Sequence, residues 1–247
     1  MRRFLSMLLL FAFFAPAVQT RAEGAEGGKK IRVLLTFGGH GFQQEPFFKM
    51  FDEMEGIEYS KAPMPQSADL LRPGLEKEYD AIVMYDMVGK ITPEQQKAFL
   101  ALLNTGIGVV SLHHNMGAHR DWDEFSKIIG GKFIFKPCEI DGKQYPRSTW
   151  SHGEDMKITV ADKEHPITKG LKDFQIHDET YGKYYTSAEV KVLFTTDHPK
   201  NDPELAWVTQ YGKSRVFYFM LGHDNHAWSN PMYPEIVLRG IRWAAGQ

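Results

Sequence analysis

Residues 108–114, with the sequence GVVSLHH, decide the fold and point to the functional site. The first five form an apolar, β-rich run without polar alternation, which is typical of a strand buried on both faces of a sheet. His113 and His114 follow directly at the end of this strand. In open α/β sheets, ligands bind outside the carboxyl ends of the strands, so we expect these imidazoles to border a site.

Two further strand and helix units precede this segment. Residues 31–37 (IRVLLTF) predict a strand that ends in a glycine-rich turn, residues 38–41 (GGHG), before a helix. Residues 81–85 (AIVMY) predict another buried strand, and the next helix begins with Thr92 as its N-cap and Pro93 in its first position. Strands that alternate with helices predict a mainly parallel sheet with helices on both faces, which is a three-layer α/β fold.

The pattern changes after residue 130. Residues 136–155 are polar and contain several prolines and glycines, which predicts a long functional loop. Short apolar runs then predict strands joined by turns, at residues 156–160, 174–177, 190–195, 205–210 and 215–220. We expect these strands to extend the sheet in antiparallel fashion, and residues 231–245 to form a closing helix with one apolar face.

The N-terminal segment predicts export. Basic residues precede an apolar run, residues 4–18, and small residues follow at the spacing of a signal-peptidase site. Residues 1–22 therefore predict a cleaved signal peptide, residues 23–30 a linker, and residues 31–247 a single domain. The apolar run is too short for a good membrane span, so we expect a periplasmic or secreted protein without stable membrane insertion after signal removal.

The composition excludes several classes of protein. The 247 residues include 43% hydrophobic residues, enough for a sizeable core, and 29 Lys plus Arg against 31 Asp plus Glu. This balance gives no basic surplus for a nucleic-acid partner, and a single cysteine, Cys138, excludes a disulfide within the chain. The sequence contains neither a phosphate-binding P-loop nor a dinucleotide fingerprint, so we expect no nucleotide cofactor.

Three histidines each follow a predicted strand. They are His40, His113 and His223. Three protein ligands with an open position form a catalytic metal site, and imidazole is a common ligand of zinc. We therefore hypothesise a divalent metal, zinc or manganese-like, bound by these histidines. The alternative is that they are unrelated loop histidines with local hydrogen bonds.

Residues 174–181 (FQIHDETY) are a second candidate site. If this segment is extended, His177 and Glu179 point to one face and Asp178 to the other. His177 and Glu179 would then supply an acid/base pair, or Glu179 would be an oxygen ligand beside the imidazoles. His152, in the polar loop, is a further candidate catalytic residue. The alternative for the segment is a solvated charged turn at the end of a strand.

A set of short motifs in fixed order carries a family resemblance over about residues 31–245. The motifs are residues 108–114 (GVVSLHH), 165–171 (HPITKGL), 178–181 (DETY), 206–208 (AWV), 212–218 (GKSRVFY), 221–224 (LGHD) and 240–244 (GIRWA). With these motifs the chain resembles the ThuA-like, trehalose-utilisation family. The resemblance implies a flavodoxin-like, class I glutamine amidotransferase-like fold.

The resemblance also implies a role in carbohydrate catabolism. The amidotransferase fold carries its cysteine nucleophile on the turn after a central strand, where this chain has residues 111–114 (SLHH), so we expect no glutamine hydrolysis. We expect instead an exported hydrolase or lyase that acts on a disaccharide or glycoside derivative, including 3-keto-glycosides, by metal-assisted acid/base elimination or hydrolysis. The alternative function is a non-catalytic carbohydrate-binding protein on the same fold.

A small-molecule carbohydrate is the expected partner, and the oligomeric state is left open. Aromatic side chains suit stacking on sugar faces, although core packing explains some of them equally well. The candidate substrate-binding residues are His114, Trp150, Asp178, Tyr181 and Asp224.

Overall fold

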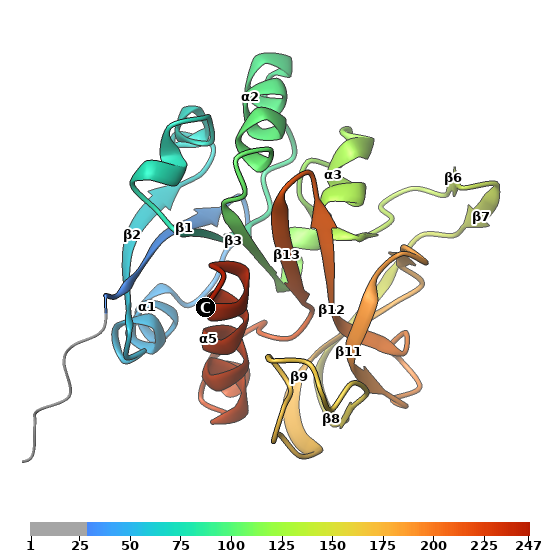
Figure 1. The fold of residues 1–247 in the computed structure, drawn as a ribbon. Helices are drawn as coiled ribbons and strands as arrows, with labels where there is room; N and C mark the ends of the chain where they lie inside the picture. The colour runs from blue at the N-terminus through green and yellow to red at the C-terminus, as the bar shows by residue number, and fades with distance from the viewer. Residues whose placement is uncertain (1–28) are drawn as a thin grey trace, which may run out of the picture.

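The computed structural model describes residues 29–247, and the predicted signal peptide lies outside the described residues. The chain forms a large sheet of nine strands, in the order β2-β1-β3-β4-β13-β12-β11-β8-β9 (Figure 1). The first five of these strands are mutually parallel: β2 (Ile57–Pro63), β1 (Ile31–Gly38), β3 (Ala81–Asp86), β4 (Gly108–Leu112) and β13 (Ser214–Phe219). This half confirms the parallel sheet predicted from the apolar runs.

The other half of the sheet is antiparallel. It consists of β12 (Glu204–Tyr211), β11 (Lys191–Thr196), β8 (Thr149–Val160) and β9 (Phe174–Gly182). The predicted fold class, a mixed α/β sheet that is parallel at one end with an antiparallel extension, is therefore confirmed.

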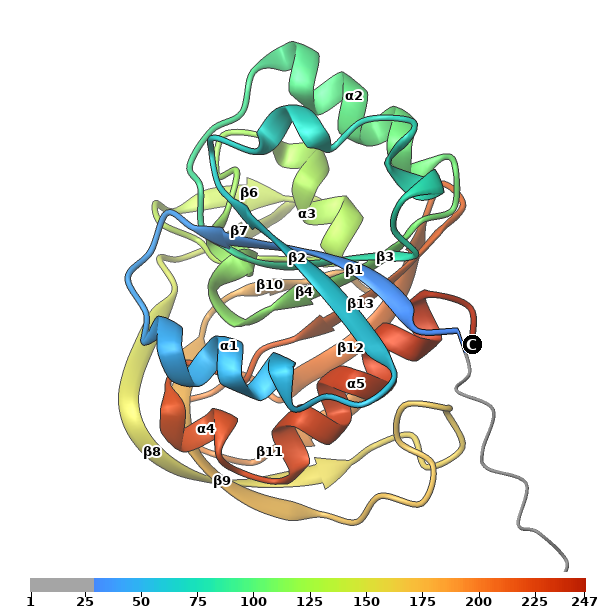
Figure 2. The ribbon, with the colours of Figure 1, turned by 90° about the vertical axis from the view of Figure 1, so that its left-hand side faces the viewer.

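Helices cover both faces of the sheet, as the alternation of strands and helices predicted. Figure 2 shows α2 (Pro93–Leu103) and α3 (Asp123–Ile129) on one side, and α1 (Gln44–Asp52), α4 (Asn225–Trp228) and α5 (Met232–Ala244) on the other. Helix α2 begins with a capping box in which Thr92 and Gln95 satisfy each other's backbone N–H groups. Within residues 29–247, no helix combines the length and the apolar character needed to cross a membrane.

Short elements fill the connections between the strands and helices. Three 3-10 helices are present, at η1 (Ala68–Leu70), η2 (Leu75–Lys77) and η3 (His113–Gly117). Four short strands form two small sheets, one of β5 (Gly131–Lys132) with β10 (Tyr185–Thr186) and one of β6 (Cys138–Ile140) with β7 (Lys143–Tyr145).

The polar segment 136–155 differs from the sequence-based expectation of a long loop. It contains the β6-β7 hairpin and the first half of β8, which runs for 12 residues instead of five. Residues 149–155 show little alternation between buried and exposed positions, because all of them are exposed or only partly buried. Trp150 and His152 line a pocket. A strand that faces solvent on one side and an open pocket on the other carries no apolar pattern.

The end of the sheet folds back over the parallel strands. β9 is the last strand in the sheet order, yet its Asp178 accepts hydrogen bonds from the backbone of Gly222 and His223, in the loop after β13. Figure 2 shows β8 and β9 passing the end of the parallel strands and curving under α4 and α5. Residues from β8 and β9 therefore reach the carboxyl ends of β4 and β13.

Close packing of α5 on β4 gives a test of the fold. A Cβ atom added to Gly108 would lie 2.6 Å from the backbone carbonyl of Ala244, so Gly108→Ala must displace the end of α5. We expect the free energy of unfolding to fall by about 1–3 kcal/mol, measured by urea denaturation. Gly41→Ala is the control, because no atom lies within 4 Å of its added Cβ. Equal losses in the two variants would contradict this packing.

Candidate functional site

Two strand ends of the parallel sheet place histidines side by side. His113 directly follows β4, is fully buried, and has a backbone φ of +48°. His223 follows β13 after Gly222, whose φ is +114°. A positive φ is uncommon for a residue with a side chain, and such strain gathers at functional sites. The backbone thus turns sharply at both strand ends and directs both imidazoles to one place.

The hydrogen bonds of His113 fix its tautomer. Its Nδ1 atom lies 2.7 Å from the carbonyl oxygen of Met220. A carbonyl can only accept, so Nδ1 carries the hydrogen and donates it. In the neutral ring, the lone pair of Nε2 therefore points to the other side, where the hydroxyl of Tyr181 lies 3.1 Å away.

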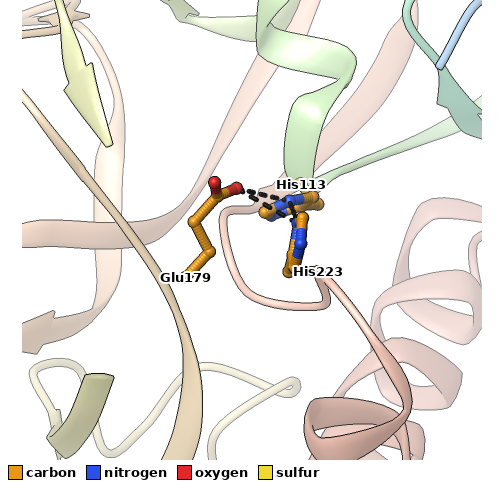
Figure 3. Close-up of side chains that lie close together, drawn as sticks. All are labelled: His113, Glu179 and His223. Carbon is orange, nitrogen blue, oxygen red and sulfur yellow. Dashed lines mark hydrogen bonds and ion pairs between the residues drawn. The ribbon is translucent and has the colours of Figure 1, made fainter. Parts of the chain in front are cut away.

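Glu179 on β9 joins the histidines into one cluster (Figure 3). Its Oε2 atom lies 3.1 Å from Nε2 of His113 and 3.3 Å from Nδ1 of His223, and these two nitrogens are 3.2 Å apart. The other oxygen, Oε1, lies 3.1 Å from Nδ1 of His152, which β8 supplies. A single carboxylate, with only 5% of its side chain exposed, thus contacts three imidazoles.

The contacts in this cluster favour the charged forms of Glu179 and His223. Burial opposes ionisation of Glu179, but the close contacts with the imidazoles of His113 and His223 outweigh it and hold the pKa of the carboxyl well below its usual range. The hydrogen bond with Glu179 likewise raises the pKa of His223. Glu179 is therefore a carboxylate near neutral pH.

One atom from each of His113, Glu179 and His223 lies within 4.8 Å of the other two, which is the spacing of a possible metal-binding group. The sequence-based hypothesis placed His40 there as the third imidazole, with Glu179 as an oxygen ligand in one of its alternatives. In the structure, the His40 ring stacks on His114 at 4.8 Å between ring centroids, and both rings line the neighbouring pocket. Burial lowers the pKa of both imidazoles, so they favour the neutral form.

Asp178 lies beneath this cluster and holds its backbone in place. Its side chain is buried and accepts hydrogen bonds from the backbone N–H groups of Gly222 at 2.6 Å, Glu179 at 2.8 Å and His223 at 3.0 Å. Burial raises the pKa of Asp178, and these three donors oppose that rise. Both oxygens of Asp178 thus accept hydrogen bonds from the protein backbone. This differs from the substrate contact predicted from the sequence.

A pocket of about 330 Å³ opens beside the cluster. One wall is polar and consists of His40, His114, His152, Glu179 and His223. The rest of the lining, here called the apolar wall, consists of Met87, Gly117, Phe133, Phe135, Trp150 and the ring of Tyr181. Such a pocket, largely apolar with converging polar groups, is typical of small-molecule sites.

Two residues singled out in the sequence lie outside this pocket. His177 and Glu179 are two positions apart on β9, but the ring of His177 turns to solvent and pairs with its cross-strand neighbour Asp155, at 2.7 Å. The predicted pairing of His177 with Glu179 is therefore wrong. Asp224 caps α4 by accepting from the backbone N–H of His226 at 2.8 Å.

Most of the apolar wall was missed by the sequence analysis. Phe133 and Phe135 lie between β5 and β6 in a segment without periodic pattern, and Met87 follows β3. No spacing signal marks them. Gly117, at the end of η3, allows the side chains of Met87 and Phe135 to pack closely on its backbone, because an added Cβ would lie only 3.1 Å from each.

The role of Asp178 can be tested by Asp178→Asn. The amide has one acceptor oxygen, and its NH₂ group would face backbone N–H donors, so at least one buried donor loses its partner. We expect the free energy of unfolding to fall by about 1–3 kcal/mol in urea denaturation. Asp173→Asn is the matched control, since Asp173 accepts only from the backbone N–H of Val160 and Asn can keep that bond. Equal stability of the two variants would contradict the anchoring role.

Comparisons with known proteins agree with this fold. A putative ThuA-like protein from Parabacteroides merdae superposes with a TM-score of 0.74 at 22% identity, over 88% of this chain and 91% of that one. A putative ThuA-like protein from Bacteroides uniformis gives 0.65 at 19% identity, over 90% and 94%. A glutamine amidotransferase from Thermotoga maritima shares the fold, with a TM-score of 0.50 at 10% identity over 88% and 99%.

No curated protein matches the sequence. The family model for ThuA, described as trehalose utilisation, matches residues 33–244. This match covers nearly all of the described chain, and the chain belongs to the ThuA family.

Proposed function

We propose that this protein is an enzyme that processes a disaccharide or glycoside derivative in the pocket beside Glu179. The observation that carries the proposal is the buried Glu179 carboxylate, which contacts three imidazoles at the polar wall of an otherwise apolar pocket. Membership of a family linked to trehalose utilisation supports a carbohydrate-related role. The aromatic side chains of the apolar wall give the bound ligand apolar surface to pack against.

We also propose that the cluster binds a divalent cation, zinc or manganese-like, through Nε2 of His113, Nδ1 of His223 and Oε2 of Glu179. These atoms are 3.1 to 3.3 Å apart, and ligand atoms around a tetrahedral zinc lie roughly 3.3 Å apart. The donation from Nδ1 of His113 to a backbone carbonyl is the arrangement that orients metal-binding imidazoles. When bound, such an ion would polarise a substrate carbonyl.

The protein side chains divide the remaining work. The low pKa of Glu179 makes it a weak base, because a general base works best when its pKa is near the working pH. Glu179 instead orients His152, whose side chain is 59% exposed at the pocket. Imidazole is the side chain that exchanges protons near neutral pH, so we assign the proton transfer to His152.

A 3-keto-glycoside shows how these groups would act. The carbonyl at C3 makes the hydrogen on C2 acidic, and His152 accepts that proton. The electron pair of the broken C2–H bond forms a C1=C2 double bond while the C1–O bond breaks, and the imidazolium of His152 returns the proton to the departing oxygen. Water then adds across the double bond, with OH at C1 and H at C2, so that the net reaction is hydrolysis.

Removal of the polar wall tests the proposal. Two quantities are measured for Glu179→Gln, His223→Gln and His152→Ala. They are the rate of turnover of 3-keto-glucosides and the amount of metal bound per protein. Glu179→Gln and His223→Gln should lose the near-stoichiometric metal, whereas His152→Ala should keep it and lose turnover by about 100-fold or more. His177→Ala, whose ring pairs with Asp155, should lose far less turnover than His152→Ala.

His198→Ala is a control for the loss of a histidine remote from the pocket. Full turnover in Glu179→Gln would contradict the assigned site. Sugar binding that is insensitive to chelator, with no product after long incubation, would show a carbohydrate-binding protein instead of an enzyme.

We further propose that the protein is exported to the periplasm or secreted. The support is the basic and apolar pattern of residues 1–22. N-terminal sequencing of the protein from its native host should find a chain that begins near residue 23. A chain that keeps residues 1–22 and stays in the cytoplasm would contradict export.

A further inference from the structure

We propose that the apolar wall of the pocket binds an aromatic aglycone, so that the preferred substrate is an aryl glycoside derivative instead of a disaccharide. This inference rests on the proposed function, because it assigns the second half of the substrate for the same site. It follows from the uneven distribution of hydrogen-bonding groups around the pocket. One part of the lining has several such groups, and the other part has few.

The apolar wall offers few partners for hydroxyl groups. The side chains of Met87, Phe133 and Phe135 have no hydrogen-bonding nitrogen or oxygen. Their neighbouring backbone groups are also used, since the N–H of Met87 donates to Gly38 at 2.8 Å and that of Phe133 to the carbonyl of Met116 at 3.2 Å. A group bound there must make its contacts through dispersion and burial.

A second sugar ring fits this wall poorly. Its hydroxyl groups project around the rim of the ring, and each one that leaves water without a partner costs free energy. An aryl ring carries no such groups and gains from burial against aromatic side chains. The polar part of the lining, with Glu179 and His152, then remains for the glycosyl half.

The aromatic side chains already form a connected surface. The ring of Phe133 lies 5.1 Å from that of Phe135, 5.2 Å from that of Tyr181 and 6.4 Å from that of Trp150. The guanidinium of Arg120 lies 4.3 Å from the centre of the Phe135 ring and helps to hold it in place. This surface is therefore pre-organised for an aromatic ligand.

Trp150 and Gly117 contribute to this surface in different ways. Trp150 is 49% exposed and is one of two large hydrophobic side chains exposed to that degree within residues 29–247. It extends the aromatic surface to the opening of the pocket. Gly117 lets Met87 and Phe135 pack directly on its backbone, because an added Cβ would lie 3.1 Å from each, and this close packing fixes the position of both side chains.

The test compares ligands that differ only in the aglycone. Dissociation constants are measured by calorimetry for phenyl, methyl and glucosyl α-glucosides, the last being trehalose, and for the matching β-linked set. Binding is used because phenol is a better leaving group than a sugar alcohol, which would bias a comparison of rates. We expect the phenyl glucoside of at least one set to bind about tenfold more tightly than its disaccharide.

Two variants locate the effect. Gly117→Ala narrows the space beside Phe135, and Phe135→Ala removes part of the wall. Each should weaken phenyl glucoside binding by about tenfold and change methyl glucoside binding by less than about twofold. Thermal unfolding checks that both variants are folded, and Phe135→Leu replaces any that is not.

The outcomes separate this inference from the proposed function. Disaccharide binding equal to or tighter than phenyl glucoside binding, with turnover of 3-keto-disaccharides, would overturn the inference and leave the proposed function intact. A phenyl preference that survives both substitutions would overturn the assigned location. Absence of binding by every glucoside, together with no turnover of the 3-keto forms, would overturn both proposals.

Discussion

The site depends on one buried carboxylate. Asp178 accepts three backbone N–H groups, two of them from the loop after β13 and one from its own strand. These bonds attach the edge strand of the antiparallel half to the loop after β13, a strand in the middle of the sheet. Because Glu179 is the next residue, the same contact brings its carboxylate to His113 and His223. Asp178 thus anchors the end of the sheet to this loop through backbone groups.

The second constraint is the backbone at His113. This residue stands on the turn after β4, where the amidotransferase-like fold would carry a cysteine nucleophile. Its φ of +48° and its bond to the carbonyl of Met220 leave Nε2 as the atom that faces the pocket side. An imidazole nitrogen with an oriented lone pair can bind a cation or a proton, but it is a poor substitute for a thiolate in forming an acyl intermediate.

Much of this arrangement could be predicted from local sequence, and the remainder could not. The apolar runs of β1, β3 and β4 mark buried strands, and the rule that sites follow strand ends correctly brought His113 and His223 together. Glu179 could be identified only as a candidate, because its contact with the histidines depends on the fold-back of β9, a long-range feature without a local pattern. The same fold-back turns His177 to solvent. The wall formed by Phe133 and Phe135 comes from irregular backbone, where no periodicity exists to be detected.

The use of strands to close the site has a consequence for its chemistry. Glu179, His152, Trp150 and Tyr181 all come from β8 and β9, which are paired along their length apart from one irregularity between Ser151 and Glu154. Residues on paired strands keep their positions better than residues on a free loop, so the carboxylate and the aromatic wall are ordered before a ligand enters. The irregularity falls beside His152, the imidazole assigned to proton transfer. His152, which exchanges a proton with the substrate in the proposed reaction, thus lies at the most weakly paired part of these strands. Glu179, in contrast, is held in place by its neighbour Asp178.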